Sequence, residues 1–136
     1  MWEKKKPICG DQIRVNRGFY YHHGIYIDDD NVIHFASPTG SEISPETAVV
    51  HKTTLRGFLK DGEVEVRCYT DEELKRRRPV SDIINYAILH QGEKGYNLVY
   101  NNCEHFSNRC AFGVSESDQV NNVFSSLGAL FGSDKR

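Results

Sequence analysis

The sequence predicts an α+β fold in which an antiparallel β-sheet packs against helices. In the first half of the chain, polar and apolar residues alternate in short runs, as they do in half-buried strands. After about residue 70 the apolar residues change to helical spacing. Strands that are grouped ahead of helices, rather than alternating with them, favour an antiparallel sheet. The length of 136 residues suits a single domain with one core.

The predicted strands include a hairpin near the N-terminus. An aromatic and β-branched run is followed by the turn residues 28–31, which are Asp-Asp-Asp-Asn, and then by a second apolar run. Such a pattern is typical of two antiparallel strands joined by a tight connection. Together the predicted strands cover residues 12–16, 19–27, 32–36, 49–53 and 63–69.

Helices are predicted around and after the last strand. Residues 54–59 suggest a single helical turn, and Thr70 with Glu73 forms a capping box that opens a helix over residues 70–77. Pro79 ends that helix. The next helix is expected to begin at a Ser81 or Asp82 cap and to stop at Gly92, and the last spans residues 101–110 behind an Asn101 or Asn102 cap.

Composition excludes several classes of protein. A net charge of −2 and an isoelectric point near 6.3 argue against a nucleic-acid binder. The four cysteines show no C-x-x-C spacing and are too few for a disulfide scaffold. No secretory signal is visible, and no stretch approaches the roughly 18 apolar residues of a membrane span. We therefore expect a cytoplasmic protein with free thiols.

Cys103 stands in the first turn of the last predicted helix. The helix dipole and the free N–H groups at such a position favour a thiolate and can lower a thiol pKa from about 8.5 by a unit or more. The same N–H groups are suited to form an oxyanion hole. The competing interpretation is that Cys103 is a small buried residue without chemistry.

A nucleophilic cysteine needs a histidine base and a third group that orients it. His105 is two residues along the same helix and points away from the Cys103 side chain. His51 and His90 are expected at the surface. The remaining histidines lie in the hairpin, where either His22 or His23 is expected beside His34.

Strand alternation decides between the two hairpin candidates. It places His22, Gly24 and Tyr26 on one face and His23 on the other. Because Gly24 lacks a side chain, we expect the helix that carries Cys103 to approach on the His22 face. This favours His22 as the base, although a purely structural pair of histidines stays open. A metal site built from these histidines and Cys103 has no H-x-x-x-H or C-x-x-C spacing behind it, so no metal or other cofactor is expected.

Three segments together resemble the lecithin retinol acyltransferase-like family, which includes the H-Ras-like suppressor phospholipases and acyltransferases. They are His-His-Gly-Ile-Tyr-Ile from residue 22, Val-Ile-His from residue 32, and Asn-Cys-Glu-His-Phe from residue 102. The resemblance runs from about Cys9 to Gly113. It implies a circularly permuted version of the NlpC-type papain-like fold, with the nucleophile at a helix N-terminus.

The resemblance also implies roles for individual residues. Cys103 is expected to be the nucleophile, His22 the general base and His34 the orienting third member. Attack on an acyl ester would give a thioester on Cys103, followed by transfer of the acyl group to an amine, a hydroxyl or water. The substrate-binding residues are expected to be His23, Tyr26 and Asn102.

The family resemblance divides the chain and predicts its partners. Residues 1–114 are expected to form the catalytic domain, and residues 115–136 a tail with a short amphipathic helix. The expected partner is an acyl donor, a lipid or another acyl ester, with peripheral contact to a membrane. A cysteine peptidase or amidase and a non-enzymatic binding module that keeps the fold are the alternatives.

Overall fold

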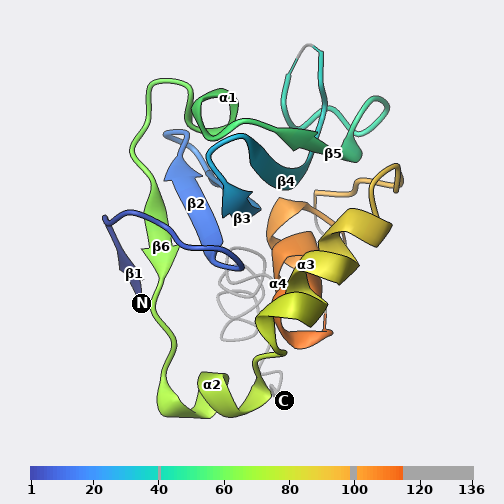
Figure 1. Ribbon diagram of the computed structural model, residues 1–136. Coiled ribbons are helices and arrows are strands. Elements are labelled where there is room, and N and C mark those ends of the chain that lie inside the picture. The colour runs from blue at the N-terminus through green and yellow to red at the C-terminus, as the bar shows by residue number, and fades with distance from the viewer. Residues whose placement is uncertain (40, 99–100, 115–136) are drawn as a thin grey trace, which may run out of the picture.

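The computed structural model describes residues 1–39, 41–98 and 101–114. Its centre is a six-stranded antiparallel sheet with the strand order β1-β6-β2-β3-β4-β5 (Figure 1). Helices pack against this sheet, which confirms the predicted α+β class. The tail at residues 115–136, with the amphipathic helix predicted there, lies outside the described residues.

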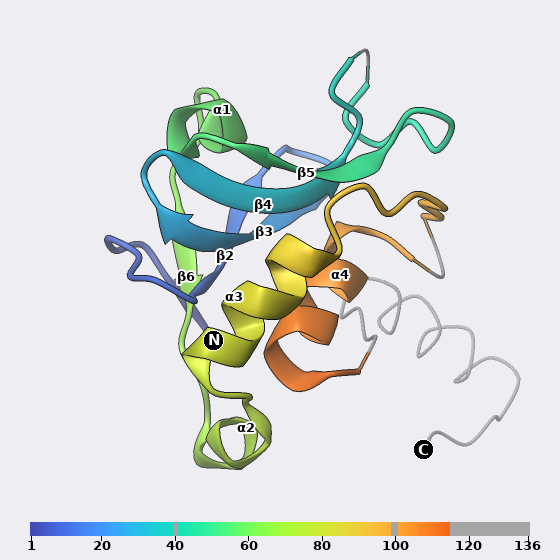
Figure 2. The same ribbon diagram turned by 45° about the vertical axis from the view of Figure 1, so that its right-hand side comes forward.

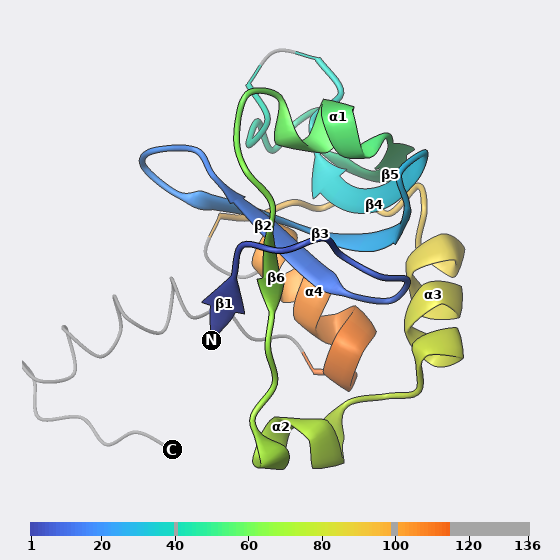
Figure 3. The ribbon, with the colours of Figure 1, turned by 60° about the vertical axis from the view of Figure 1, so that its left-hand side comes forward.

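The strands follow the predicted pattern closely in the first half of the chain. Their bounds are β1 (Trp2–Glu3), β2 (Gln12–Asn16), β3 (Tyr21–Asp28), β4 (Asn31–Ala36), β5 (Val49–Thr53) and β6 (Glu65–Arg67). The β3–β4 hairpin, β2 and β5 confirm the prediction, whereas β6 is shorter than expected. The two-residue strand β1 was not expected, and it pairs with β6 at the edge of the sheet (Figure 3).

The helices are α1 (Leu55–Leu59), α2 (Asp71–Arg76), α3 (Val80–Leu89) and α4 (Cys103–Phe112). Helix α2 opens with the predicted capping box. The predicted cap of α3 was wrong, because Pro79 occupies the cap position, two residues before Ser81. The Pro79 carbonyl already accepts the N–H groups of Asp82 and Ile83, and its φ of −56° suits a helix start. No helix in the described part of the chain is long and apolar enough to cross a membrane.

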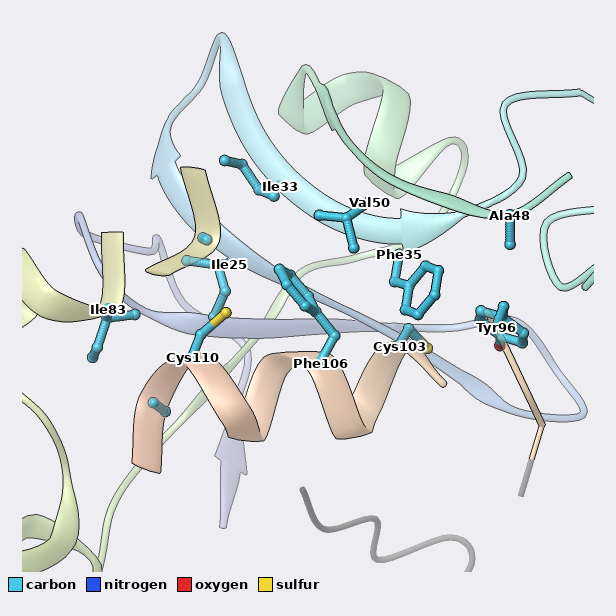
Figure 4. Packing of buried hydrophobic residues seen from close by; sticks show 12 residues of the cluster. Ile25, Ile33, Phe35, Ala48, Val50, Ile83, Tyr96, Cys103, Phe106 and Cys110 are labelled. Carbon is cyan, nitrogen blue, oxygen red and sulfur yellow. The ribbon is translucent and has the colours of Figure 1, made fainter. Parts of the chain in front are cut away.

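The helices cover both faces of the sheet. Helices α3 and α4 lie against one face and α1 against the other (Figure 2). The larger cluster of buried residues fills the space between the sheet and α3 and α4, and it includes Ile25, Phe35, Phe106 and Cys103 (Figure 4). The smaller cluster, with Phe58 of α1, fills the other face. The sheet therefore separates α1 from α4.

Candidate active site

Cys103 is the first residue of α4, and Asn102 caps the helix in front of it. The Asn102 Oδ1 accepts the N–H groups of Glu104 and His105 at 3.0 and 3.1 Å, and the His105 Nδ1 accepts the Asn102 N–H at 3.0 Å. The Asn102 amide also donates to the Leu98 carbonyl at 2.8 Å. Asn102 and His105 thus form a capping box that fixes the start of α4. The predicted role of Asn102 in substrate binding stays a prediction.

The Cys103 sulfur lies against the main chain of β3. It donates to the Tyr21 carbonyl at 3.9 Å, and the N–H of His23 bonds to it. The Tyr96 side chain is hydrogen-bonded to the sulfur. Figure 4 shows Tyr96 next to Cys103, beyond the N-terminal end of α4. Cys103 is only 3% exposed. The sulfur is therefore held between the two peptide groups that flank His22.

The contact between Cys103 and β3 is possible because the pairing of β3 with β4 ends there. The β3–β4 pairing runs from Gly24–His34 to Asp28–Asn31, so the peptide groups of residues 21–23 lie beyond its end. On the other side, β3 pairs with β2 as far as Tyr21. The Cys103 sulfur thus occupies the β4-side edge of β3 just past the last β3–β4 pair.

The environment of the thiol differs from the sequence-based expectation. Burial raises the pKa of Cys103 to about 12, although the N–H groups of His23 and Glu104 act in the opposite direction. The predicted lowering of this pKa by the helix N-terminus was therefore wrong, because the loss of water around the sulfur outweighs the helix donors. Burial thus favours the protonated thiol of Cys103 over the thiolate.

The hairpin brings His22 and His34 together, as one of the two predicted pairings required. The His22 Nε2 lies 2.8 Å from the His34 Nδ1, and both rings are buried. Among the described residues, the His22 Nδ1 and the His34 Nε2 are buried without a hydrogen-bond partner. Since a hydrogen bond between two rings uses one proton, His22 can donate from Nε2 and keep a bare lone pair on Nδ1.

The electrostatic environment keeps His22 neutral. Burial lowers its pKa well below the usual value, and the neighbouring His34 and the Arg17 guanidinium act in the same direction. Burial likewise lowers the pKa of His34. A neutral imidazole is the form that can accept a proton.

The predicted alternation of β3 is confirmed, but the predicted approach of the helix was wrong. His22 stacks on Phe58 of α1 with ring centroids 5.0 Å apart, and a Cβ added to Gly24 would lie 2.7 Å from the same ring. The space that Gly24 leaves is thus filled by α1. Helix α4 packs on the opposite face, where Ile25 contacts its apolar residues. Cys103 approaches His22 along the strand edge rather than over the face.

The two other predicted binding residues lie in different surroundings. His23 is buried on the α4 face beside the Trp2 ring, with centroids 5.5 Å apart, and burial lowers its pKa to about 4. Tyr26 belongs to the cluster under α1, and its hydroxyl donates to Asp29 at 2.6 Å. Tyr26 and Cys103 thus belong to clusters on opposite faces of the sheet, and the role of Tyr26 in substrate binding stays a prediction.

Sequence reasoning missed an acidic residue beside His22. Glu42 lies in the β4–β5 connection, and its Oε2 is 3.5 Å from the His22 Nε2. Arg17 binds both carboxylate oxygens at 2.9 Å, and the Tyr20 hydroxyl donates to Oε1 at 2.7 Å. The connection has the composition of an ordinary Ser/Pro/Gly-rich loop. Its partners Arg17 and Tyr20 lie more than twenty residues earlier, so no local pattern marks Glu42 as buried.

The remaining histidines are half-buried rather than exposed. His51 of β5 packs on His34 with centroids 4.5 Å apart, and His90 stacks on Tyr86 at 3.8 Å. Both were expected at the surface, but each ring covers a neighbouring ring. Among the described residues, no group of three or more histidine, cysteine or acidic side chains is arranged to hold a metal ion.

Comparison with known proteins decides the family. The sequence model described as "Lecithin retinol acyltransferase" matches residues 5–116, which is most of the chain. The chain belongs to this family. It is 32% identical over 154 residues to human phospholipase A and acyltransferase 3, covering 96% of this chain and 94% of the relative. The mouse protein of the same name is 35% identical over 135 residues, covering 90% and 82%, and human phospholipase A and acyltransferase 2 is 28% identical over 138 residues, covering 95% and 85%.

Proposed function

We propose that this protein is a thiol-dependent phospholipase or acyltransferase that carries the acyl group as a thioester on Cys103. Family membership and the names of the relatives support the reaction class. The observation that carries the assignment of residues is the position of the Cys103 sulfur between the Tyr21 carbonyl and the His23 N–H. The residue between those two peptide groups is His22, whose buried Nδ1 has no partner in the described part of the chain.

His22 is the base in this proposal because of the atom that faces the main chain. In a histidine, Nδ1 is the ring nitrogen nearer the backbone, and Nε2 is the farther one. Here Nε2 is engaged with His34, which leaves Nδ1 on the side of the main chain that Cys103 contacts. His34 fixes the ring and the tautomer, as the third member of a catalytic triad does.

The resting site is a neutral pair of thiol and imidazole, since burial disfavours both charged forms. During attack, the sulfur forms a bond to the ester carbonyl carbon while its proton moves to the His22 Nδ1. The resulting imidazolium gives that proton to the leaving alcohol oxygen as the C–O bond breaks, and the acyl group stays on sulfur. An acceptor amine, hydroxyl or water then loses a proton to His22, attacks the thioester and releases the Cys103 thiol.

The oxyanion that forms during attack needs fixed donors. Asn102 already occupies the N–H groups of Glu104 and His105, so the helix offers fewer free donors than its sequence suggests. We propose that the N–H of Cys103 and the hydroxyl of Tyr96 stabilise the oxyanion, because Tyr96 bonds to the sulfur itself.

The arrangement of the catalytic residues also bears on the fold. We propose the circularly permuted papain-like arrangement, in which the histidine-bearing strands precede the cysteine-bearing helix in the chain. The order His22, His34, Cys103, with Cys103 at the start of α4 against the sheet, supports it. The acyl donor is proposed to be a phospholipid, which is what the names of the relatives indicate.

Intact-mass measurement after incubation with a panel of phospholipids and acyl thioesters tests this proposal. We expect a mass increase of one acyl group on the native chain and none on Cys103→Ala. Cys110→Ala is the matched control, because Cys110 is a fully buried cysteine of the same helix. The Cys110→Ala protein should still be acylated on Cys103. An adduct that persists in Cys103→Ala, or cleavage of peptide amides without acyl-ester activity, would overturn the proposal.

A further inference from the structure

Glu42 is held by several contacts in a largely buried position next to the histidine pair. Its side chain is 9% exposed, and the Arg17 side chain that binds it is 13% exposed. The Arg17 guanidinium makes a two-point contact with the carboxylate and also donates to the Phe58 and Leu59 carbonyls at the end of α1. A carboxylate fixed by a two-point arginine contact has little freedom to turn away.

These contacts keep Glu42 ionised. Burial alone would raise its pKa, but the hydrogen bonds from Arg17 and Tyr20 outweigh burial and hold the pKa below the usual value. The Lys60 ammonium, at 3.9 Å and largely exposed, adds to the same effect. A carboxylate whose surroundings favour the ionised form therefore lies 3.5 Å from the His22 Nε2.

We propose that Glu42 is a positioning residue that stabilises the His22 imidazolium during acyl transfer. The inference rests on the proposed role of His22 as the base. When the thiol proton reaches Nδ1, a full positive charge appears on a buried ring, and His34 as a neutral partner cannot compensate it. The carboxylate of Glu42 lies on the Nε2 side, which is the side of the ring away from the proposed nucleophile, as is the orienting acid of a catalytic triad.

Arg17 should increase the effect that loss of Glu42 has on the His22 imidazolium. Its guanidinium lies near His22 and, after burial and His34, lowers the pKa of that ring even with the carboxylate in place. Loss of the carboxylate would leave this cation without its ion-pair partner. Among the described residues, the charged or titratable groups that act on Glu42, His22 or His34 are Arg17, Tyr20, His23, His51, Lys60, Tyr96 and Cys103. Removing only the negative charge leaves these groups in place and makes the surroundings of His22 more positive.

The test measures single-turnover acylation of Cys103 against pH in Glu42→Gln, Glu42→Asp and the native protein. Glu42→Gln keeps the shape but removes the charge, so we expect the plateau rate to fall about 10²-fold. The acidic limb of the profile should move to lower pH, because His22 loses the anion that favours its protonated form. Glu42→Asp should recover part of the rate.

Glu46→Gln is the matched control, because Glu46 is an exposed glutamate of the same connection. It should leave both the rate and the profile unchanged. If Glu42→Gln does not fold, as shown by thermal unfolding, Arg17→Met with Glu42→Gln removes both buried charges and should slow acylation about tenfold.

The outcomes separate the two proposals. Failure to acylate Cys103 in the native protein would overturn the proposed function. Normal acylation of native protein together with an unshifted acidic limb in Glu42→Gln, or an equal loss of rate in Glu46→Gln, would overturn the role of Glu42 alone. A native-like rate in the folded double variant would overturn it as well.

Discussion

Two groups of buried polar side chains flank β3, and they differ in how completely their hydrogen bonds are made. The first is the His22 cluster, which consists of Arg17, Tyr20, His22, His34 and Glu42. The second, the Gln12 network, joins Gln12 of β2 to α4 and β6 through Arg67, Tyr69, Ser107 and Asn108.

The Gln12 network satisfies its central side chain fully. The Gln12 Nε2 donates to Ser107 at 2.9 Å and to Asn108 at 2.8 Å, and its Oε1 accepts from Tyr69 at 2.9 Å. In the His22 cluster, by contrast, two ring nitrogens are buried without partners among the described residues. The complete network joins α4 to the sheet. The incomplete one leaves the His22 Nδ1 without a partner in the described part of the chain, and in the proposed function this nitrogen accepts the thiol proton.

The largest effect should come from breaking the incomplete group at His22. His22→Gln keeps an amide that can bond His34 but cannot accept the thiol proton. We expect acylation of Cys103 to slow by about 10²- to 10⁴-fold, with little change in thermal unfolding. His90→Gln is the matched control, since His90 stacks on Tyr86 at the end of α3 and should leave the rate unchanged. A native rate in His22→Gln would mean that another group takes the proton.

Disrupting the Gln12 network should lower stability and leave the rate of acylation nearly unchanged. Gln12→Leu leaves polar atoms of Ser107 and Tyr69 without their partner, so we expect the free energy of unfolding to fall by roughly 1–3 kcal/mol. The rate of acylation should change by no more than about threefold, because Gln12 contacts the middle of α4 rather than its start. Chemical denaturation measures the first quantity, with the exposed Gln91→Leu as the control. If Gln12→Leu lost much of its acylation rate without losing stability, the two groups would not differ in the way described.

The parts of the fold that depend on local chemistry were predictable from the sequence. The Asp-rich turn and its flanking strands specify the β3–β4 hairpin, and Asn102 specifies the start of α4. The pairing of β1 with β6 was not predictable, because it joins Trp2 to Arg67 across most of the domain and each strand is very short. Pro79 misled the prediction of α3, since a proline that ends one helix can equally begin the next.

The candidate site was predictable only where one strand carries the information. Alternation along β3 separates His22 from His23 correctly, but Gly24 could admit either α1 or α4, and Phe58 of α1 fills the space. Glu42 escaped notice because its partners Arg17 and Tyr20 lie more than twenty residues earlier. The raised pKa of Cys103 follows from burial, which a linear sequence does not report.

If Cys103 attacks as a neutral thiol with His22 as its base, the pH dependence of single-turnover acylation in the native protein should report the titration of His22 and not that of the thiol. Burial lowers the pKa of His22 well below the usual value of about 6.5. The acylation rate should therefore increase with pH only in the acidic range, where His22 loses its proton, and stay constant through neutral pH. A rate that rises tenfold per pH unit above pH about 8 would follow ionisation of the thiol itself, whose pKa burial raises to about 12, and would show that His22 is not the base.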